Sequence, residues 1–190
     1  MGNRRFSRKR LFEVEKRGQT VELGAGAGIK DAIASATQHR NGAELITEIA
    51  IDLAPAGATI ASGNGTDKVC GVAGKAGEIT QLTVAKFGNI TEYRVVVVEA
   101  PDHAVNVAMG SATTHNTGAS VTGHTEINGG TGLATVGQDI TLPLDTVATH
   151  QNPAGTPETL YITDDSGTSG NFTSGKLLIY LHGFIAPADL

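Results

Sequence analysis

The fold of this chain is decided by one stretch, Lys176-Leu177-Leu178-Ile179-Tyr180-Leu181-His182-Gly183-Phe184-Ile185. Successive side chains of a β-strand point to opposite faces, so Leu177, Ile179 and Leu181 share one face, while Leu178 and Tyr180 lie on the other. Apolar bulk on both faces is typical of a strand that lies inside a sheet. We therefore predict a central strand over residues 176–185.

The clearest amphipathic strand lies over residues 45–53. Its odd-numbered positions are Leu45, Thr47, Ile49, Ile51 and Leu53, and its even-numbered positions include Glu48 and Asp52. One side can therefore face a core while the carboxylates meet water. Asn41-Gly42 favours a tight hairpin just before it, so residues 30–40 form either the partner strand or a short helix.

Shorter apolar runs indicate further strands between polar, Gly-rich loops. We expect residues 80–87 to form a hairpin with residues 90–100 through the turn pair Gly88-Asn89. Within the second arm of that hairpin, residues 94–99 are expected to be nearly fully buried. The other expected strands lie around residues 69–72, 104–109, 119–127, 133–136, 140–144 and 160–163.

The composition supports an all-β body. The chain has 190 residues and is 39% hydrophobic, enough for a sizeable core in one domain. It has five Phe, three Tyr and no Trp, so Val, Ile, Leu and Ala must fill that core, and the β-branched residues among them favour strands. Turn residues recur at intervals of roughly ten residues, the strand spacing of sandwiches and barrels. We expect a single such domain over residues 29–190.

The charge of the chain is divided between a basic arm and an acidic body. Residues 1–17 hold seven of the fourteen Lys and Arg residues against two Glu, a net charge of +5, and residues 18–190 hold seven cations against seventeen carboxylates, a net charge of −10. Alternating glycines at Gly24, Gly26 and Gly28 relax the backbone and indicate a hinge. We therefore predict an extended basic N-terminal arm with its hinge over residues 1–28, whose first seventeen residues can reach about 55 Å.

The arm is the predicted binding site, and the preferred partner is an acidic groove on another protein. Guanidinium groups form charge-assisted hydrogen bonds with acidic groups, and the aromatic and aliphatic residues between them can act as anchors. Nucleic-acid binding and a solvated tail are the alternatives, but the acidic body would repel a polyanion and the basic stretch is not a folded face interleaved with aromatic residues. The residues expected to bind are Arg4, Arg5, Phe6, Arg8, Lys9, Arg10, Leu11, Phe12, Lys16 and Arg17.

Several other functions find no support in the sequence. No stretch approaches the ~20 apolar residues of a membrane helix, and no apolar segment follows the basic start as in a signal peptide. The single Cys70 cannot form an internal disulfide and is expected to be an inert buried thiol. His115 and His124 lack zinc-ligand spacing, and the acidic loop at residues 164–171 lacks an EF-hand pattern. We predict no catalytic residue, no metal ligand and no cofactor.

Four segments carry a family likeness: Asn3-Arg4-Arg5-Phe6-Ser7-Arg8-Lys9-Arg10-Leu11-Phe12-Glu13-Val14-Glu15-Lys16, Ser35-Ala36-Thr37-Gln38-His39-Arg40, Ile90-Thr91-Glu92 and Gly175-Lys176-Leu177-Leu178-Ile179-Tyr180-Leu181-His182-Gly183-Phe184. Together they resemble capsid decoration, or cement, proteins of aquatic tailed bacteriophages. The resemblance implies an antiparallel β-sandwich, often jelly-roll-like, that binds the outer surface of a phage capsid. It also implies a bridge between neighbouring major capsid subunits, with no catalytic or ligand residues to carry over.

The leading hypothesis is therefore a non-enzymatic virion structural protein. Its partners would be the major capsid protein and further copies of itself, as a dimer or trimer, and it would be found in the host cytoplasm during assembly and then on the capsid surface. The alternative is a carbohydrate-binding β-sandwich of a phage fibre, with binding loops at residues 115–124 and 164–171. The scarcity of aromatic residues argues against this alternative, because sugar platforms usually need exposed rings.

Overall fold

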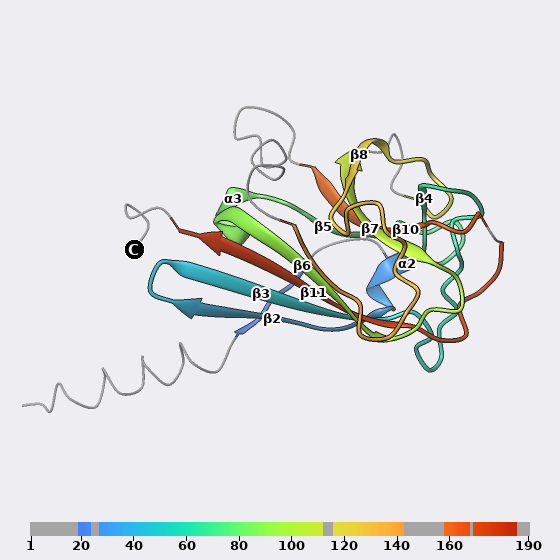
Figure 1. Cartoon of the computed structure of the whole chain (residues 1–190), viewed down its shortest axis with the longest axis horizontal. Coiled ribbons are helices and arrows are strands. Elements are labelled where there is room, and N and C mark those ends of the chain that lie inside the picture. The colour runs from blue at the N-terminus through green and yellow to red at the C-terminus, as the bar shows by residue number, and fades with distance from the viewer. Residues whose placement is uncertain (1–18, 24–26, 112–115, 143–157, 168, 186–190) are drawn as a thin grey trace, which may run out of the picture.

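The protein is built from two antiparallel β-sheets that enclose one core. A computed structural model describes residues 19–23, 27–111, 116–142, 158–167 and 169–185. The six-stranded sheet has the order β1 (Gln19–Thr20), β2 (Ile33–Asn41), β3 (Glu44–Asp52), β11 (Lys176–Phe184), β6 (Asn89–Glu99) and β9 (Asp139–Leu142) (Figure 1). The five-stranded sheet has the order β4 (Lys68–Val69), β10 (Thr159–Asp164), β7 (Val105–Ser111) and β8 (Thr122–Glu126), with β5 (Glu78–Gln81) also paired to β10. The prediction of an all-β sandwich is confirmed, whereas a jelly-roll connection of its strands stays a prediction.

The central position predicted for residues 176–185 is confirmed. Strand β11 pairs along its length with β3 on one side and with β6 on the other, so that Ile179 lies between Ile49 and Val95. Leu177, Ile179 and Leu181 are fully buried, while the alternate residues are only partly covered. The strand is thus internal to its sheet, and its apolar outward face is half-buried.

The segment before the amphipathic strand is a strand and not a helix. β2 and β3 form a hairpin in which Asn41 pairs with Glu44, and the turn residue Gly42 has a φ of 63° that favours glycine. Along β3, Leu45, Thr47, Ile49 and Ile51 are buried and the residues between them are partly exposed. Both features follow the sequence pattern.

The expected hairpin through Gly88-Asn89 is wrong. Thr80 pairs with Leu160 of the other sheet, and the chain then forms a one-turn helix, α3 (Val84–Phe87), before β6 begins at Asn89. Gly88, with a φ of 66°, ends that helix. Residues 80–87 therefore connect the two sheets, because their partner in β10 lies far away in the sequence, where a local pattern cannot reveal it.

Strand β6 is also less buried than its run of valines suggests. Val95 and Val97 are in the core, whereas Val98 is 49% exposed, because no second layer of described residues covers that side. Residues 133–136 do not form the expected strand, and only a single bridge joins Leu133 to Val105. The strand expected over residues 69–72 is shorter and ends at Val69.

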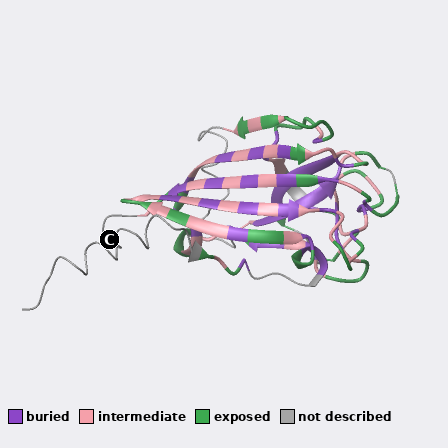
Figure 2. Ribbon diagram, turned by 90° about the horizontal axis from the view of Figure 1, so that it is seen from below, coloured by how far each residue is buried: buried purple, intermediate pink, exposed green. Residues whose placement is uncertain are grey.

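The two sheets differ in how their outer faces are covered. Every residue of β10, and every residue of β7 except Ser111, is buried, because loops pack over the outer side of the five-stranded sheet. Tyr161 packs there against Val69 and Val121 in a small apolar cluster. The six-stranded sheet instead shows alternating buried and half-buried residues along its strands, and none of the described elements lies over it in Figure 2.

The sequence predicts an arm and hinge over residues 1–28, but the sandwich already includes residues from Gln19 onward. Thr20 of β1 pairs with Thr37 of β2, and Leu23 is only 6% exposed in the core. A one-turn helix, α2 (Ala27–Lys30), follows, and Ile29 is fully buried. Residues 19–23 are thus part of the sandwich, because an apolar residue beside a sheet edge is stabilised by burial.

Candidate interaction surface

The outward side of the six-stranded sheet, here called the open face, carries both aliphatic and charged side chains. The registers of β3, β11 and β6 place Ile46, Ala50, Leu178, Tyr180 and Val96 on this side, all partly exposed. Cross-strand neighbours on one face of a sheet lie close enough to interact. The open face therefore combines a sheet framework with apolar surface that the described residues leave uncovered.

An ion pair and an aromatic contact organise the centre of the open face. The Arg94 guanidinium donates two hydrogen bonds to the Asp139 carboxylate, with Nε–Oδ1 at 2.7 Å and Nη2–Oδ2 at 2.6 Å. These bonds raise the pKa of Arg94 and lower that of Asp139. The guanidinium also lies 5.5 Å from the centre of the Tyr180 ring. Burial and the neighbouring Glu48 carboxylate raise the pKa of Tyr180, which therefore stays protonated at neutral pH.

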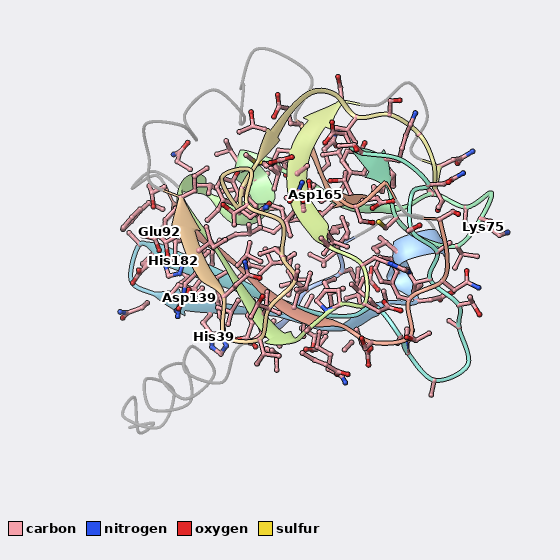
Figure 3. The ribbon with its side chains drawn as sticks, turned by 45° about the vertical axis from the view of Figure 1, so that its right-hand side comes forward. His39, Lys75, Glu92, Asp139, Asp165 and His182 are labelled. Carbon is pink, nitrogen blue, oxygen red and sulfur yellow. The ribbon has the colours of Figure 1, made fainter. Side chains whose placement is uncertain are left out.

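The open face is acidic. Its outward positions hold six carboxylates and two Lys or Arg residues, a formal charge of −4 with neutral histidines. The carboxylates are Glu44, Glu48, Asp52, Glu92, Glu99 and Asp139, and the cations are Arg94 and Lys176. Lys176 is paired with Glu99, and His182 Nε2 lies 3.9 Å from Glu92 Oε1. His39, Glu92, Asp139 and His182 lie along the same side of the molecule in Figure 3.

A groove, here called the hairpin groove, lies beside the β2–β3 hairpin and α3. It has a volume of about 510 Å³, and its described lining residues are Gln38, Arg40, Leu45, Val84, Ala85, Lys86, Gly88 and Ile185. Gln38 donates hydrogen bonds to the Thr47 hydroxyl at 2.9 Å and to the Lys86 carbonyl at 3.0 Å, and so ties α3 to the sheet. Among these described lining residues are two cations and no carboxylate, although the Glu22 carboxylate lies near enough to oppose the lowering of the Lys86 pKa.

The two cations of the hairpin groove are held differently. Arg40 donates from Nε to the carbonyl of Gly42 at 3.0 Å, which fixes its guanidinium beside the hairpin turn. Lys86 lies 5.7 Å from the centre of the Phe87 ring, and burial lowers its pKa. A cation that has lost part of its hydration favours an anionic partner. The groove thus suits a segment that carries acidic and aliphatic side chains.

The predicted arm enters the body next to the hairpin groove. Gln19, the first described residue, pairs with Gln38, which lines that groove. The binding residues predicted from the sequence all lie outside the described residues, so the structure does not test whether they come together. They are Arg4, Arg5, Phe6, Arg8, Lys9, Arg10, Leu11, Phe12, Lys16 and Arg17. Arg40 and Lys86 are not among the residues predicted to bind, because the sequence allows a strand or a short helix at Arg40 and predicts a strand at Lys86, where the structure has a helix.

The acid–histidine contacts of the described residues have structural explanations. His103 Nε2 lies 4.0 Å from Asp102 Oδ2, and the His103 ring packs edge-on against Phe172. Asp102 Oδ2 accepts hydrogen bonds from the amide and the hydroxyl of Thr173 at 3.0 and 2.7 Å. Burial would raise the pKa of Asp102, but these hydrogen bonds and His103 together lower it. The carboxylate therefore fixes a turn.

Cys70 and Asp164, whose side chains could in principle react or bind a metal, are both buried within the fold. Cys70 is fully buried, as expected, and burial raises the pKa of its thiol, while its low reactivity stays a prediction. Asp164, in the loop considered for calcium or sugar, is fully buried and accepts hydrogen bonds from the amide and hydroxyl of Ser166, both at 2.8 Å. Within the described residues, no group of three or more His, Cys, Asp or Glu side chains could hold a metal.

The carbohydrate-binding alternative stays a prediction. His115, Thr168 and the side chain of His124 lie outside the described part of the structure. No helix of the described ranges is both long and apolar enough to cross a membrane. Comparisons of the chain with models of protein families, with curated proteins and with solved structures found no match.

Proposed function

We propose that this chain is a non-enzymatic structural protein of a phage virion, which binds the outer surface of the capsid and bridges neighbouring major capsid subunits. The observation that carries the proposal is that the basic arm joins the sandwich beside a groove lined by two cations. The arm, with a net charge of +5, precedes Gln19, and Gln19 pairs with a residue of the groove that holds Arg40 and Lys86. An acidic protein surface fits both parts at once.

The physical reason for such a protein is mechanical and needs no chemistry. A subunit that spans a joint between two shell proteins adds interface area and slows their separation. Because many equivalent copies act together, modest individual interfaces give a large collective effect. Self-association into a dimer or trimer would add further linkage, and assembly would take place in the host cytoplasm.

The proposal is tested on empty capsids assembled from the major capsid protein of the same phage. Deletion of residues 2–17 is expected to reduce occupancy, measured by electron microscopy, because the cationic contacts and the anchors Phe6 and Phe12 are lost. Substitution of Arg40 and Lys86 by Gln is expected to reduce occupancy less. The matched control replaces two exposed cations elsewhere, Lys30 and Lys75, by Gln. Undiminished occupancy after the deletion would refute the arm as the attachment site.

A further inference from the structure

We propose that the open face binds residues 4–12 of the arm of the same chain while no capsid is present. The open face is the outward side of β2, β3, β11, β6 and β9, and the arm segment is Arg4-Arg5-Phe6-Ser7-Arg8-Lys9-Arg10-Leu11-Phe12. The proposal rests on the proposed function in one respect only, that the same arm is the segment offered to the capsid.

The charges of the open face match those of the arm. Strand β3 presents Glu44, Glu48 and Asp52 on its outward side, and the structure pairs none of these three with a described Lys or Arg in an ion pair. The two cations of the face are neutralised by partners of their own, Arg94 by Asp139 and Lys176 by Glu99. A net charge of −4 therefore faces outward, where a segment with a net charge of +5 begins close by.

The side chains of β3 and of an extended arm recur with the same period, and part of the two patterns is complementary. The outward side of β3 reads Glu44, Ile46, Glu48, Ala50 and Asp52, with carboxylates and aliphatic residues in alternation at every second position. An extended arm places Arg4, Phe6, Arg8, Arg10 and Phe12 on one of its sides, which gives cations and aromatic rings at the same period of two. When Arg4, Phe6 and Arg8 are aligned with Glu44, Ile46 and Glu48, the cations lie opposite carboxylates and the ring lies opposite an aliphatic side chain. Arg10 and Phe12 then fall opposite Ala50 and Asp52, so the match covers three of the five positions.

The open face also has apolar surface to cover. Ile46, Leu178, Tyr180 and Val96 are only half-buried, and Val98 is 49% exposed. The five-stranded sheet is closed by its own loops, so this sheet is the one whose outer side remains available among the described residues. Burial of two phenylalanine rings on such a surface is favourable by about 25 cal/mol per Å² of apolar area removed from water.

The arm of the same chain can reach the open face, and it should occupy that face in preference to the arm of a second copy. The seven residues from Phe12 to Gln19 span up to about 23 Å, and β3 lies two strand spacings, about 10 Å, from β1. Gly18 stands at the junction, where a reversal of direction needs a permissive residue. A tethered segment meets its site at an effective concentration in the millimolar range, far above that of a free partner.

As a consequence, the arm has to leave the open face of its own chain when it attaches to a capsid. The free protein has its cations and its Phe6 and Phe12 covered, so non-specific association through the arm is suppressed. An acidic capsid surface must then bind the arm more tightly than the open face does, since a ligand shifts an equilibrium only by its difference in affinity.

The test is carbodiimide crosslinking of the full-length protein without capsids. The variant Arg8→Lys keeps the charge and supplies an amine that can form an amide with a nearby carboxylate. A mixture of ¹⁴N and ¹⁵N chains separates links within one chain from links between chains in the mass spectrum. We expect links from position 8 to Glu44, Glu48 or Asp52 within single chains, and a yield about tenfold lower in 1 M salt, where the Debye length is about 3 Å.

A pair of matched variants in the Arg8→Lys background tests the anchors. Phe6→Ser with Phe12→Ser is expected to lower the crosslink yield about tenfold, whereas Val14→Ser, an apolar-to-polar change in the arm outside residues 4–12, leaves it nearly unchanged. Absence of these links, or links spread equally to Glu78 of β5 and Asp67 just before β4, would overturn the proposal. Links only between isotopically different chains would assign the site to a second copy and also overturn it. No capsid is present, so failure here leaves the attachment proposal standing.

Discussion

Gly183→Ala should destabilise the protein by wedging α3 away from the central strand. Gly183 lies on the core side of β11, and a Cβ atom there would stand 2.1 Å from the carbonyl oxygen of Phe87 and 3.3 Å from that of Asn89. Both neighbours are backbone atoms at the junction of α3 and β6, so neither can rotate away. The Phe87 carbonyl has to retreat by about 1 Å to reach a normal contact.

The expected loss of stability follows from two opposing contributions. Overpacking of this kind typically costs about 3 kcal/mol when backbone must move. Replacing Gly by Ala lowers the entropy of the unfolded chain and returns about 0.7 kcal/mol. The net expectation is a free energy of unfolding lower by about 2 kcal/mol. With a urea m-value of about 2 kcal/mol/M, the unfolding midpoint, followed by circular dichroism, shifts down by about 1 M.

The control is a Gly→Ala substitution at a position where the nearest atom belongs to a side chain that can move. At Gly170 a Cβ would approach His103 Nε2 at 3.2 Å, the far end of a side chain, so Gly170→Ala should change the midpoint by less than about 0.3 M. If Gly183→Ala is as stable as the original protein, α3 does not pack on β11 as described, and the hairpin groove would lose its wall.

Three further outcomes follow from one polar network, one buried thiol and one hydrogen-bonded carboxylate. Asn128→Ala should cost about 3 kcal/mol in urea unfolding, because it removes the acceptor of the buried Val107 amide and the donor to Asn106, and a loss under 1 kcal/mol would argue against this network. Cys70 should react with a thiol reagent about a thousandfold more slowly in the native protein than in urea, and rapid native labelling would show that the thiol is accessible. Because the pKa of Asp102 is lowered in the folded state, its stabilising effect is complete above the ordinary aspartate range and is lost as the pH falls through the lowered pKa. Asp102→Asn should therefore show a weaker fall of the urea midpoint below about pH 4, and equal acid sensitivity of both proteins would contradict the assignment.

The local parts of the fold could be predicted from the sequence. The alternation from Leu45 to Leu53 and the pair Asn41-Gly42 are sufficient for the β2–β3 hairpin, because both act between residues close in the chain. The apolar residues on both sides of Leu177–Leu181 correctly indicated a central strand. These signals depend on periodicity and turn chemistry, which a single sequence carries.

The errors arose where distant contacts decide the structure. Residues 80–87 were assigned to a hairpin because Gly88-Asn89 suits a turn, but Thr80 is held by Leu160, eighty positions away. The run of valines ending at Val98 suggested burial on both faces, although the described structure covers only one. Arg40 and Lys86 meet at one groove only because α3 packs beside the hairpin, an arrangement that no local pattern encodes.

A map of capsids carrying the full-length protein tests the central proposal most directly. We predict density for residues 1–17 along major capsid subunits, with Arg40 and Lys86 of the hairpin groove turned toward acidic residues of the shell. A body attached through its opposite end, or an arm that remains on the open face in the assembled particle, would contradict it.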